Sequence, residues 1–216
     1  MRRLVVGITG ASGVIYGIRL LEVLRGYPDL ETHLVISKPA ERTIVEETSY
    51  RVSDIKAMAS HVHAVTDIGA SIASGSFQTM GMVVILCSIH TVSAIAYCLS
   101  ENLVTRAADV VLKEGRTLVL VVRETPLHVG HLKSCLAAAE AGAVILPPVP
   151  AFYNQPKTLA HVIDHTVGRV LDRFGLAHQL SARWGEAQSE RASTAPSEAS
   201  SRALRGHGPR PNADKE

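Results

Sequence analysis

Short runs of β-branched and other apolar residues recur along most of the chain, and a stretch of helical periodicity follows each of them. The runs are wholly apolar and do not alternate with polar residues, which is typical of strands buried on both faces. We expect five such strands, over residues 4–9, 33–36, 82–87, 118–122 and 143–146. A chain with this pattern has to place its strands between layers of helices.

The helical stretches complete the pattern, and the last one is the clearest because its apolar residues fall on one face. Strand–helix alternation predicts an α/β fold in three layers, a Rossmann-like or flavodoxin-like parallel sheet with helices on both faces. In such sheets ligands bind outside the carboxyl ends of the strands, so a site is expected there. The predicted helices cover residues 14–24, a segment opening near Pro39, and residues 91–99, 103–113, 127–141 and 159–174.

The composition changes at Gln179. From there to Glu216 the chain is rich in Ser, Ala, Arg, Glu and Pro and has few large apolar residues. Such a segment cannot bury enough surface to offset the entropy lost on ordering. We therefore expect one domain over residues 1–178 and a disordered tail over residues 179–216, with Leu180 and Trp184 as its docking anchors.

Charge and composition exclude several classes of protein. Lys and Arg number 22 against 20 Asp and Glu, and aromatic residues make up 4%, so neither a basic stripe nor a base-stacking platform for nucleic acid is expected. The three widely spaced cysteines predict no disulfide framework and suit a reducing compartment. No apolar run is long enough to cross a membrane and no secretion signal precedes the first strand, so we expect a cytoplasmic protein.

Small and hydroxyl-bearing residues follow the first three strands. Glycine lets the backbone approach a ligand closely, and the start of the next helix favours a phosphate. Ordinary helix capping is a common alternative for each hydroxyl taken singly, and for Ser12 the two interpretations weigh about the same. Three such ends in one sheet nevertheless favour a polar cleft. The residues are Gly10, Ala11 and Ser12 after the first strand, Ser37 after the second, and Ser88, Ile89, His90 and Thr91 after the third.

Charged residues mark the fourth strand and the helix before it. Arg123 offers a bidentate fork for phosphate, and Glu124 beside it can orient that fork or move a proton. Arg106 and Lys113 lie on the preceding predicted helix, where a solvated charged face is the plainer interpretation.

Two further candidates lie near the end of the predicted domain. Tyr153 belongs to a proline-rich loop over residues 147–156, and a loop stiffened in this way is typical of one that shapes a site. Arg169 falls among the apolar positions of the last helix, where a plain surface cation is the alternative.

The histidines do not predict a metal centre. His128 with His131, and His161 with His165, have the spacing of one helix face, but neither pair has a nearby Glu or a third ligand. An Asp-rich cluster that would hold magnesium on a diphosphate is also absent from the sequence. We therefore expect Arg, Lys and backbone groups to bind any phosphate.

Eight segments, in order along residues 3–176, resemble the UbiX-type flavin prenyltransferases. The subgroup most similar to this chain serves hydroxyarylic-acid decarboxylases. The segments that carry the resemblance are residues 9–13, 74–79, 106–110, 112–114, 123–127, 142–148, 150–153 and 168–171.

The resemblance implies a metal-independent enzyme that joins the dimethylallyl group of dimethylallyl monophosphate to reduced FMN. In that reaction the flavin N5 attacks the prenyl carbon as phosphate departs, and C6 then closes a fourth ring. The product, prenylated FMN, is passed to a UbiD-type decarboxylase. The family typically forms dodecamers in which the flavin lies between subunits.

The resemblance also assigns roles to residues. Ser12 would hydrogen-bond N5, and Glu47 would lie near the reacting edge of the flavin, while Lys113 and Glu124 would complete the catalytic set. A carboxylate or the released phosphate would accept the C6 proton. The flavin would be held by Gly10, Ala11, Ser12, Ser37, Ser88, Ile89, His90, Thr91 and Arg123, and the prenyl phosphate by Arg106, Lys113, Glu124, Tyr153 and Arg169.

The chain departs from the family at three places. The family's Pro-Cys-Ser-Met-Lys-Thr after the third strand is replaced over residues 86–91, where Leu86 takes the place of proline and His90 replaces a permanent charge with an imidazole. Gly115 stands in the usual Lys-Glu-Arg-Arg, a change that spares Lys113. The single tryptophan, Trp184, lies in the predicted tail and not over the prenyl site.

Two alternatives share the expected fold. A flavin-dependent cysteine decarboxylase would use an Asn-rich loop after the third strand, and this chain has none there. A non-catalytic FMN-binding protein would lack the combination of Lys113, Glu124, Tyr153 and Arg169.

Overall fold

The computed structural model describes residues 1–181. Leu180, near the end of this part, is half-buried and packs against the core, as expected of an anchor. The other predicted anchor, Trp184, and the remainder of the predicted tail lie outside the described residues.

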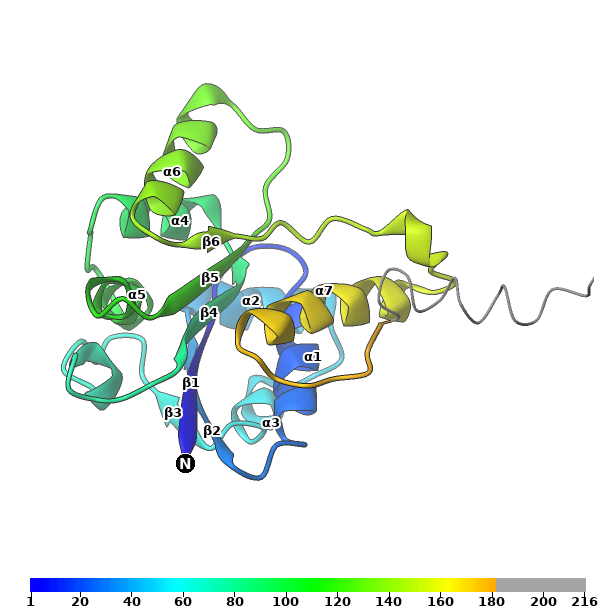
Figure 1. The fold of residues 1–216 in the computed structure, drawn as a ribbon, viewed down its shortest axis with the longest axis horizontal. Helices are drawn as coiled ribbons and strands as arrows, with labels where there is room; N and C mark the ends of the chain where they lie inside the picture. The colour runs from blue at the N-terminus through cyan, green and yellow to red at the C-terminus, as the bar shows by residue number, and fades with distance from the viewer. Residues whose placement is uncertain (182–216) are drawn as a thin grey trace, which may run out of the picture. The chain divides into compact units, whose positions relative to one another are not determined.

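The centre of the fold is a six-stranded sheet in which every neighbouring pair of strands is parallel (Figure 1). The strand order is β3-β2-β1-β4-β5-β6, so the direction of winding reverses between β1 and β4. This order confirms the predicted α/β sheet, and it is that of the doubly wound nucleotide-binding folds. The strands are β1 (Arg2–Ile8), β2 (Leu30–Ile36), β3 (His61–His63), β4 (Gly81–Cys87), β5 (Thr117–Val122) and β6 (Val144–Ile145).

Helices cover both faces of the sheet and make the two outer layers (Figure 1). One face is covered by α1 (Ile15–Leu24), α2 (Lys38–Glu47), α3 (Val52–Lys56) and α7 (Leu159–Arg173). The opposite face is covered by α4 (Ile89–Ala96), α5 (Leu103–Lys113) and α6 (Val129–Glu140). Two short 3₁₀ turns, η1 (Ser71–Ala73) and η2 (Phe152–Asn154), lie in the connections.

Alternate residues of each central strand supply the two cores. In β1, Leu4, Val6 and Ile8 face the α1 and α7 side, and Val5 faces the α4 and α5 side. The same division holds in β5, where Val119 and Leu120 go to opposite cores. A strand buried in this way needs apolar residues at every position, which is the physical reason for the wholly apolar runs.

The sequence pattern misses one strand and one helix. The edge strand β3 has three residues, two of them histidines, and its exposed Val62 gives no apolar run. The five-residue α3 is likewise too short to show a helical period. The sequence therefore predicts no helix or strand between α2 and β4, although this stretch contains the edge strand of the sheet.

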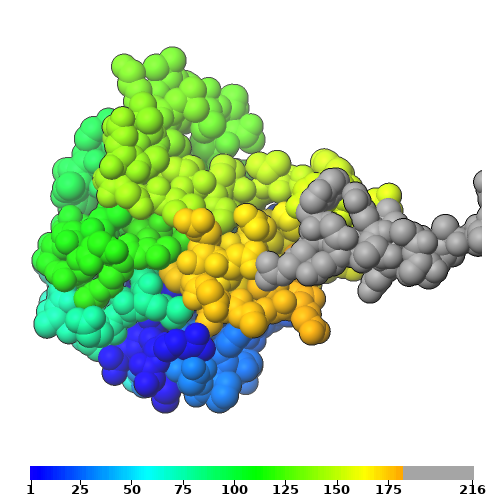
Figure 2. Space-filling model, in the orientation of Figure 1, coloured from blue at the N-terminus to red at the C-terminus, as the bar shows by residue number. Residues whose placement is uncertain are grey.

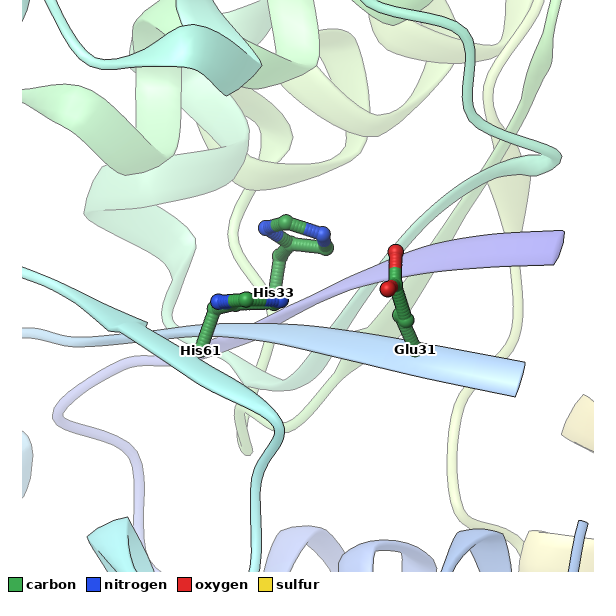
Figure 3. A group of neighbouring side chains, drawn as sticks. All are labelled: Glu31, His33 and His61. Carbon is green, nitrogen blue, oxygen red and sulfur yellow. The ribbon is translucent and has the colours of Figure 1, made fainter. Parts of the chain in front are cut away.

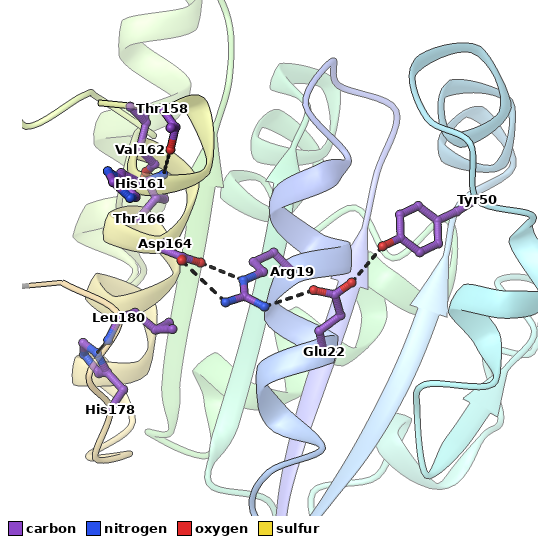
Figure 4. A network of polar contacts seen from close by, with 10 residues as sticks. All are labelled: Arg19, Glu22, Tyr50, Thr158, His161, Val162, Asp164, Thr166, His178 and Leu180. Carbon is purple, nitrogen blue, oxygen red and sulfur yellow. Dashed lines mark hydrogen bonds and ion pairs between the residues drawn. The ribbon is translucent and has the colours of Figure 1, made fainter. Parts of the chain in front are cut away.

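A polar network fixes α7 against α1 (Figure 4). Arg19 of α1 donates to Asp164 of α7 over 2.7 Å and also bonds Glu22 over 3.1 Å. The Tyr50 hydroxyl then donates to the other oxygen of Glu22 over 2.8 Å. In Figure 2, the yellow and orange residues of α7 lie at the surface near the centre of the view. The network sets the position of the helix that carries Arg169.

Candidate active site

A cavity of about 420 Å³ opens at the carboxyl ends of β1, β2, β4 and β5. Its position is the point where the winding of the sheet reverses, as expected for the ligand site of such a fold. Its volume falls in the range of small-molecule sites. The lining residues are Thr9, Gly10, Ala11, Ser12, Ser37, Pro39, Ser88, Ile89, His90, Thr91, Asn102, Arg123 and Glu124. The structure thus brings together all nine predicted flavin ligands and Glu124 (the "cleft residues" below).

Thr9 joins the ends of β1 and β4. Its buried hydroxyl donates to the carbonyl of Leu86 over 2.9 Å and accepts from the Ser88 backbone N–H over 2.8 Å. These bonds hold the two loops that follow the strands side by side. The glycine loop after β1 therefore faces the hydroxyl-rich segment after β4.

Two of the cleft hydroxyls cap helices that begin at the cavity. Ser37 Oγ accepts from the Ala40 N–H over 3.2 Å at the start of α2, and Ser88 Oγ accepts from the Thr91 N–H over 3.3 Å at the start of α4. Ser88 Oγ also lies 3.0 Å from Thr91 Oγ1. Capping and a polar cleft are therefore not alternatives here. The positive ends of two helix dipoles and their hydroxyls meet in one cavity, which suits an anion.

The glycine loop over residues 10–13 is organised differently. Gly10 lies so close to Pro39 that a Cβ there would collide with it, and Gly13 has a φ of +103°. Helix α1 begins after Val14 without a side-chain cap, so Ser12 is not an N-cap. Glu47 instead accepts the Gly13 N–H over 2.7 Å, so this loop does not offer that donor to a phosphate as the sequence suggested.

Glu47 is held as a carboxylate beside the cleft. Burial acts to raise the pKa of Glu47, but hydrogen bonds from Ser12, Gly13 and Val14 and the charge of Arg123 outweigh it, so the pKa lies below its usual value. The hydrogen bond from Ser12 fixes a hydroxyl and a carboxylate next to each other. Ser12 lines the cavity, so this pair can orient a polar ligand atom and exchange a proton with it.

Arg123 and Glu124 close the side of the cleft at the end of β5. The Arg123 N–H donates to the Cys87 carbonyl over 3.2 Å, which places the residue beside the end of β4. Glu124 is half-buried, and its Oε1 accepts the N–H of Thr125 over 3.0 Å. A cation and a carboxylate therefore stand next to each other at the cavity wall.

The four other predicted residues do not line the cleft of their own chain. Each has a local partner in the single chain. Arg106 donates to Asp109 over 3.0 Å, Lys113 to Glu114 over 2.6 Å, and Arg169 to Asp172 over 3.1 Å, while the Tyr153 hydroxyl lies 3.3 Å from Nε2 of His165.

These "outer residues" fall into two groups on opposite faces of the sheet. Arg106 and Lys113 lie on α5, and Lys113 ends the helix about 16 Å from the end that reaches the cleft. Tyr153 of η2 and Arg169 of α7 both lie near His165, and the Tyr153 hydroxyl contacts its ring. Burial lowers the pKa of His165 below its usual value, and the positive charge of Arg169 lowers it further. In the single chain, neither group lines the cleft at the carboxyl ends of the strands.

Three further residues that line the cavity escaped the sequence reasoning. Thr9 and Pro39 flank predicted positions, and Asn102 comes from a different segment. Asn102 caps α5, since its Oδ1 accepts from the N–H groups of Val104 and Thr105. An Asn directly before a helical pattern is a signal that could have found it.

Comparison with known proteins decides the family. The Flavoprotein family model matches residues 1–169. The flavin prenyltransferase UbiX of Escherichia coli K12 is 58% identical over 186 residues, which cover 85% of this chain and 98% of that protein. The chain belongs to the UbiX family of flavin prenyltransferases.

Solved structures agree with this family. AnUbiX (PadA1), crystallised with FMN and dimethylallyl pyrophosphate, has a TM-score of 0.83 and 49% identity, over 85% of this chain and 97% of that one. A dodecameric FMN-dependent UbiX-like decarboxylase of Escherichia coli O157:H7 has the same TM-score with 51% identity, over 84% and 98% of the two chains. Among the described residues, no helix of this chain is long and apolar enough to cross a membrane.

Proposed function

We propose that this chain transfers a dimethylallyl group from dimethylallyl monophosphate to N5 and C6 of reduced FMN. The observation that carries the proposal is the single cavity that collects all nine predicted flavin ligands and Glu124 from four strand ends. Membership of the UbiX family and the FMN complex of AnUbiX (PadA1) support the same reaction.

The cleft residues fit FMN in their chemistry. The hydroxyls of Ser37 and Ser88, at the starts of α2 and α4, and the guanidinium of Arg123 suit the flavin phosphate. Ser12, held by Glu47, would hydrogen-bond the reacting edge of the ring. When bound, reduced FMN supplies the nucleophilic nitrogen, and the chain supplies position and charge.

The prenyl phosphate would be bound where subunits meet. The outer residues Lys113 and Arg169 are exposed in the single chain, and the UbiX-like decarboxylase relative is a dodecamer. Helix α6 also exposes Val129, Leu132 and Leu136, at helical spacing, to 53–67%. Apolar side chains in such a row suit an interface between copies of this chain. We infer that neighbouring subunits of a homododecamer bring their outer residues to each cleft.

In that assembly the outer residues would act on the leaving group. The cations Arg106, Lys113 and Arg169 and the Tyr153 hydroxyl would stabilise the negative charge that develops on the departing phosphate. Their hydrogen bonds would hold the prenyl carbon over the flavin, so much of the rate enhancement would come from positioning. Glu124, at the cavity wall, would accept or relay the proton released from the ring.

The remaining expectations belong to the same proposal. The product would be passed to a UbiD-type decarboxylase, and the reaction would take place in the cytoplasm. The domain over residues 1–178 would carry the activity, because every cleft residue and every outer residue lies within it.

The experiment is an anaerobic incubation of the purified chain with reduced FMN and dimethylallyl monophosphate, followed by mass measurement of the extracted flavin. We expect a flavin heavier by one C5H8 unit. Unchanged FMN from folded protein would contradict the proposal. Omission of the prenyl phosphate is the control, and dimethylallyl pyrophosphate in its place measures donor preference.

The same preparation tests the two alternatives. A cysteine decarboxylase would release carbon dioxide from a peptide with a carboxyl-terminal cysteine, and we expect no release. A non-catalytic FMN-binding protein would bind FMN and return it unmodified.

A further inference from the structure

A second cluster of reactive side chains lies at the edge of the sheet, apart from the cleft (Figure 3). Strand β2 contributes Glu31 and His33, and the neighbouring strand β3 contributes His61 and His63. His33 is paired with His61 in the register of the two strands. Because side chains two residues apart on a strand point to the same side, all four share one face of the sheet.

His33 has an unsatisfied ring nitrogen inside this cluster. The side chain is buried, with 4% exposure, and its Nδ1 lies 3.0 Å from Nε2 of His63. Its Nε2 is also buried and has no hydrogen-bond partner. A buried polar atom of this kind is costly, and native structures rarely leave one without a partner. If Nδ1 donates its proton to His63, Nε2 presents a lone pair.

The group has the composition of a metal site. Glu31, His33 and His61 each offer one ligand atom, and these three atoms lie within 4.8 Å of one another. Two imidazole nitrogens and a carboxylate are a ligand set that Zn²⁺ accepts, with bonds of about 2.0–2.2 Å and water in the remaining position. Arg3 donates a hydrogen bond to Oε2 of Glu31 over 2.9 Å, so Oε1 is the oxygen that would bind the ion.

We propose that Glu31, His33 and His61 bind a divalent transition-metal ion of the Zn²⁺ type. His63 is the positioning residue, because its contact with Nδ1 fixes the ring of His33 and its tautomer. The ion would link the three-residue edge strand β3 to its neighbour β2. Without the ion, a short ladder of backbone hydrogen bonds holds β3 to β2. Ligands from two strands would thereby add a link to the short backbone ladder between them.

The site is separate from the reaction. His33 precedes Ser37 of the cleft by four residues, about 13 Å along an extended strand. None of its three ligands lines the cavity. The proposal therefore stands whether or not the proposed prenyl transfer is correct, and it leaves that transfer independent of metal.

The test is a titration of Zn²⁺ into the full chain after removal of metal with a chelator. Calorimetry should show one ion bound per subunit. Free Zn²⁺ at 100 times its dissociation constant should raise the Tm by about 5–10 °C. Mg²⁺, which prefers oxygen ligands, should give neither signal. Absence of saturable Zn²⁺ binding would overturn the proposal.

Variants identify the ligands. His61 is exposed at the sheet edge, so His61→Gln should leave the fold intact and weaken Zn²⁺ binding at least about 100-fold, and His63→Gln should weaken it about 10- to 100-fold. His131→Gln is the matched control, because His131 of α6 and His128, which caps that helix, form another histidine pair with ring centres 3.5 Å apart. The proposal would be overturned if His61→Gln bound Zn²⁺ as tightly as the unsubstituted chain, or if His131→Gln lost Zn²⁺ binding.

Discussion

The cleft residues and the outer residues differ in how one chain places them. The cleft residues come from four strand ends, yet they surround one cavity, because parallel strands bring their carboxyl ends to one edge of the sheet. The outer residues lie on α5, η2 and α7 and pair with local partners on opposite faces. The sheet therefore gathers the predicted flavin ligands around one cavity within one chain, whereas in the proposed assembly the outer residues come to the cleft of a neighbouring chain.

The cleft residues and the outer residues should therefore respond differently to substitution. Changes among the outer residues should slow the transfer and leave FMN bound. Changes among the nine predicted flavin ligands should weaken the binding of FMN, whereas a change at Glu124 should slow the transfer with FMN still bound. The predictions that follow test this separation, and then the backbone and the carboxylate that shape the cleft.

The largest effect is expected at Lys113. Lys113→Ala removes a cation from the leaving phosphate and should lower kcat about 100- to 1,000-fold. FMN affinity, measured by flavin fluorescence, should be unchanged because Lys113 does not line the cavity. Arg25→Ala, which removes an exposed cation at the end of α1, should change neither quantity. Loss of FMN binding in the Lys113 variant would remove the distinction between the cleft residues and the outer residues.

A smaller effect on a different quantity is expected at Ser88. Ser88→Ala removes a hydroxyl from the start of α4, where we expect the flavin phosphate. The dissociation constant of FMN should rise about 10- to 100-fold, which is the effect of losing one hydrogen bond to a charged group. Transfer at saturating FMN should be much less affected. Ser53→Ala, at an exposed serine of α3, is the control. An unchanged dissociation constant would place the flavin phosphate elsewhere.

Gly13 tests the backbone of the glycine loop. Gly13 has a φ of +103°, and a Cβ there would come within 2.7 Å of the Leu86 side chain. Gly13→Ala should therefore lower the free energy of unfolding by about 1–3 kcal/mol, measured in urea. Gly115 also has a positive φ, +65°, but a Cβ there meets nothing within 4 Å. Gly115→Ala should cost less, and equal costs would show that contact with Leu86 is unimportant.

The smallest effect concerns the charge of Glu47. Hydrogen bonds from Ser12, Gly13 and Val14 keep the pKa of Glu47 below its usual value in the folded chain, so the charged form stabilises the fold. That contribution is present above the pKa of the unfolded chain and is lost as pH falls through the lower pKa of the folded chain. Because Glu47 is exposed, we expect less than about 1 kcal/mol.

Glu47→Gln measures this contribution. Its difference in unfolding free energy from the unsubstituted chain should be constant from pH 6 to 8 and shrink at acidic pH. A difference that grows on acidification would reverse the sign of the argument.

The sequence predicted the fold well where burial dictates residue type. Strands β4 and β5 are buried at nearly every position, so their apolar runs located them within one residue. The cleft followed from the rule on strand ends, and Asn102 was missed because it approaches from the start of a helix. Strand β3 was missed because an edge strand of three residues has no pattern.

The sequence could not show which chain supplies each outer residue. Lys113 and Arg169 are recognisable in a motif, but no pattern in the sequence says whose Glu124 they would approach in the proposed assembly. The sequence could not predict the proposed metal site either, because its three ligands meet only in the folded chain. Glu31 and His33 are near in sequence, but His61 joins them only through the pairing of β2 with β3.

Complementation between two inactive variants tests the divided site most directly. Glu124→Gln damages the cleft and Lys113→Ala damages an outer residue, so oligomers co-expressed from the two should contain some sites with both residues intact. The account predicts that these mixed oligomers regain prenyl transfer, while mixtures of Arg123→Ala and Glu124→Gln, two residues of one cleft, do not. Mixed oligomers of Glu124→Gln and Lys113→Ala with no more activity than either variant alone would contradict it.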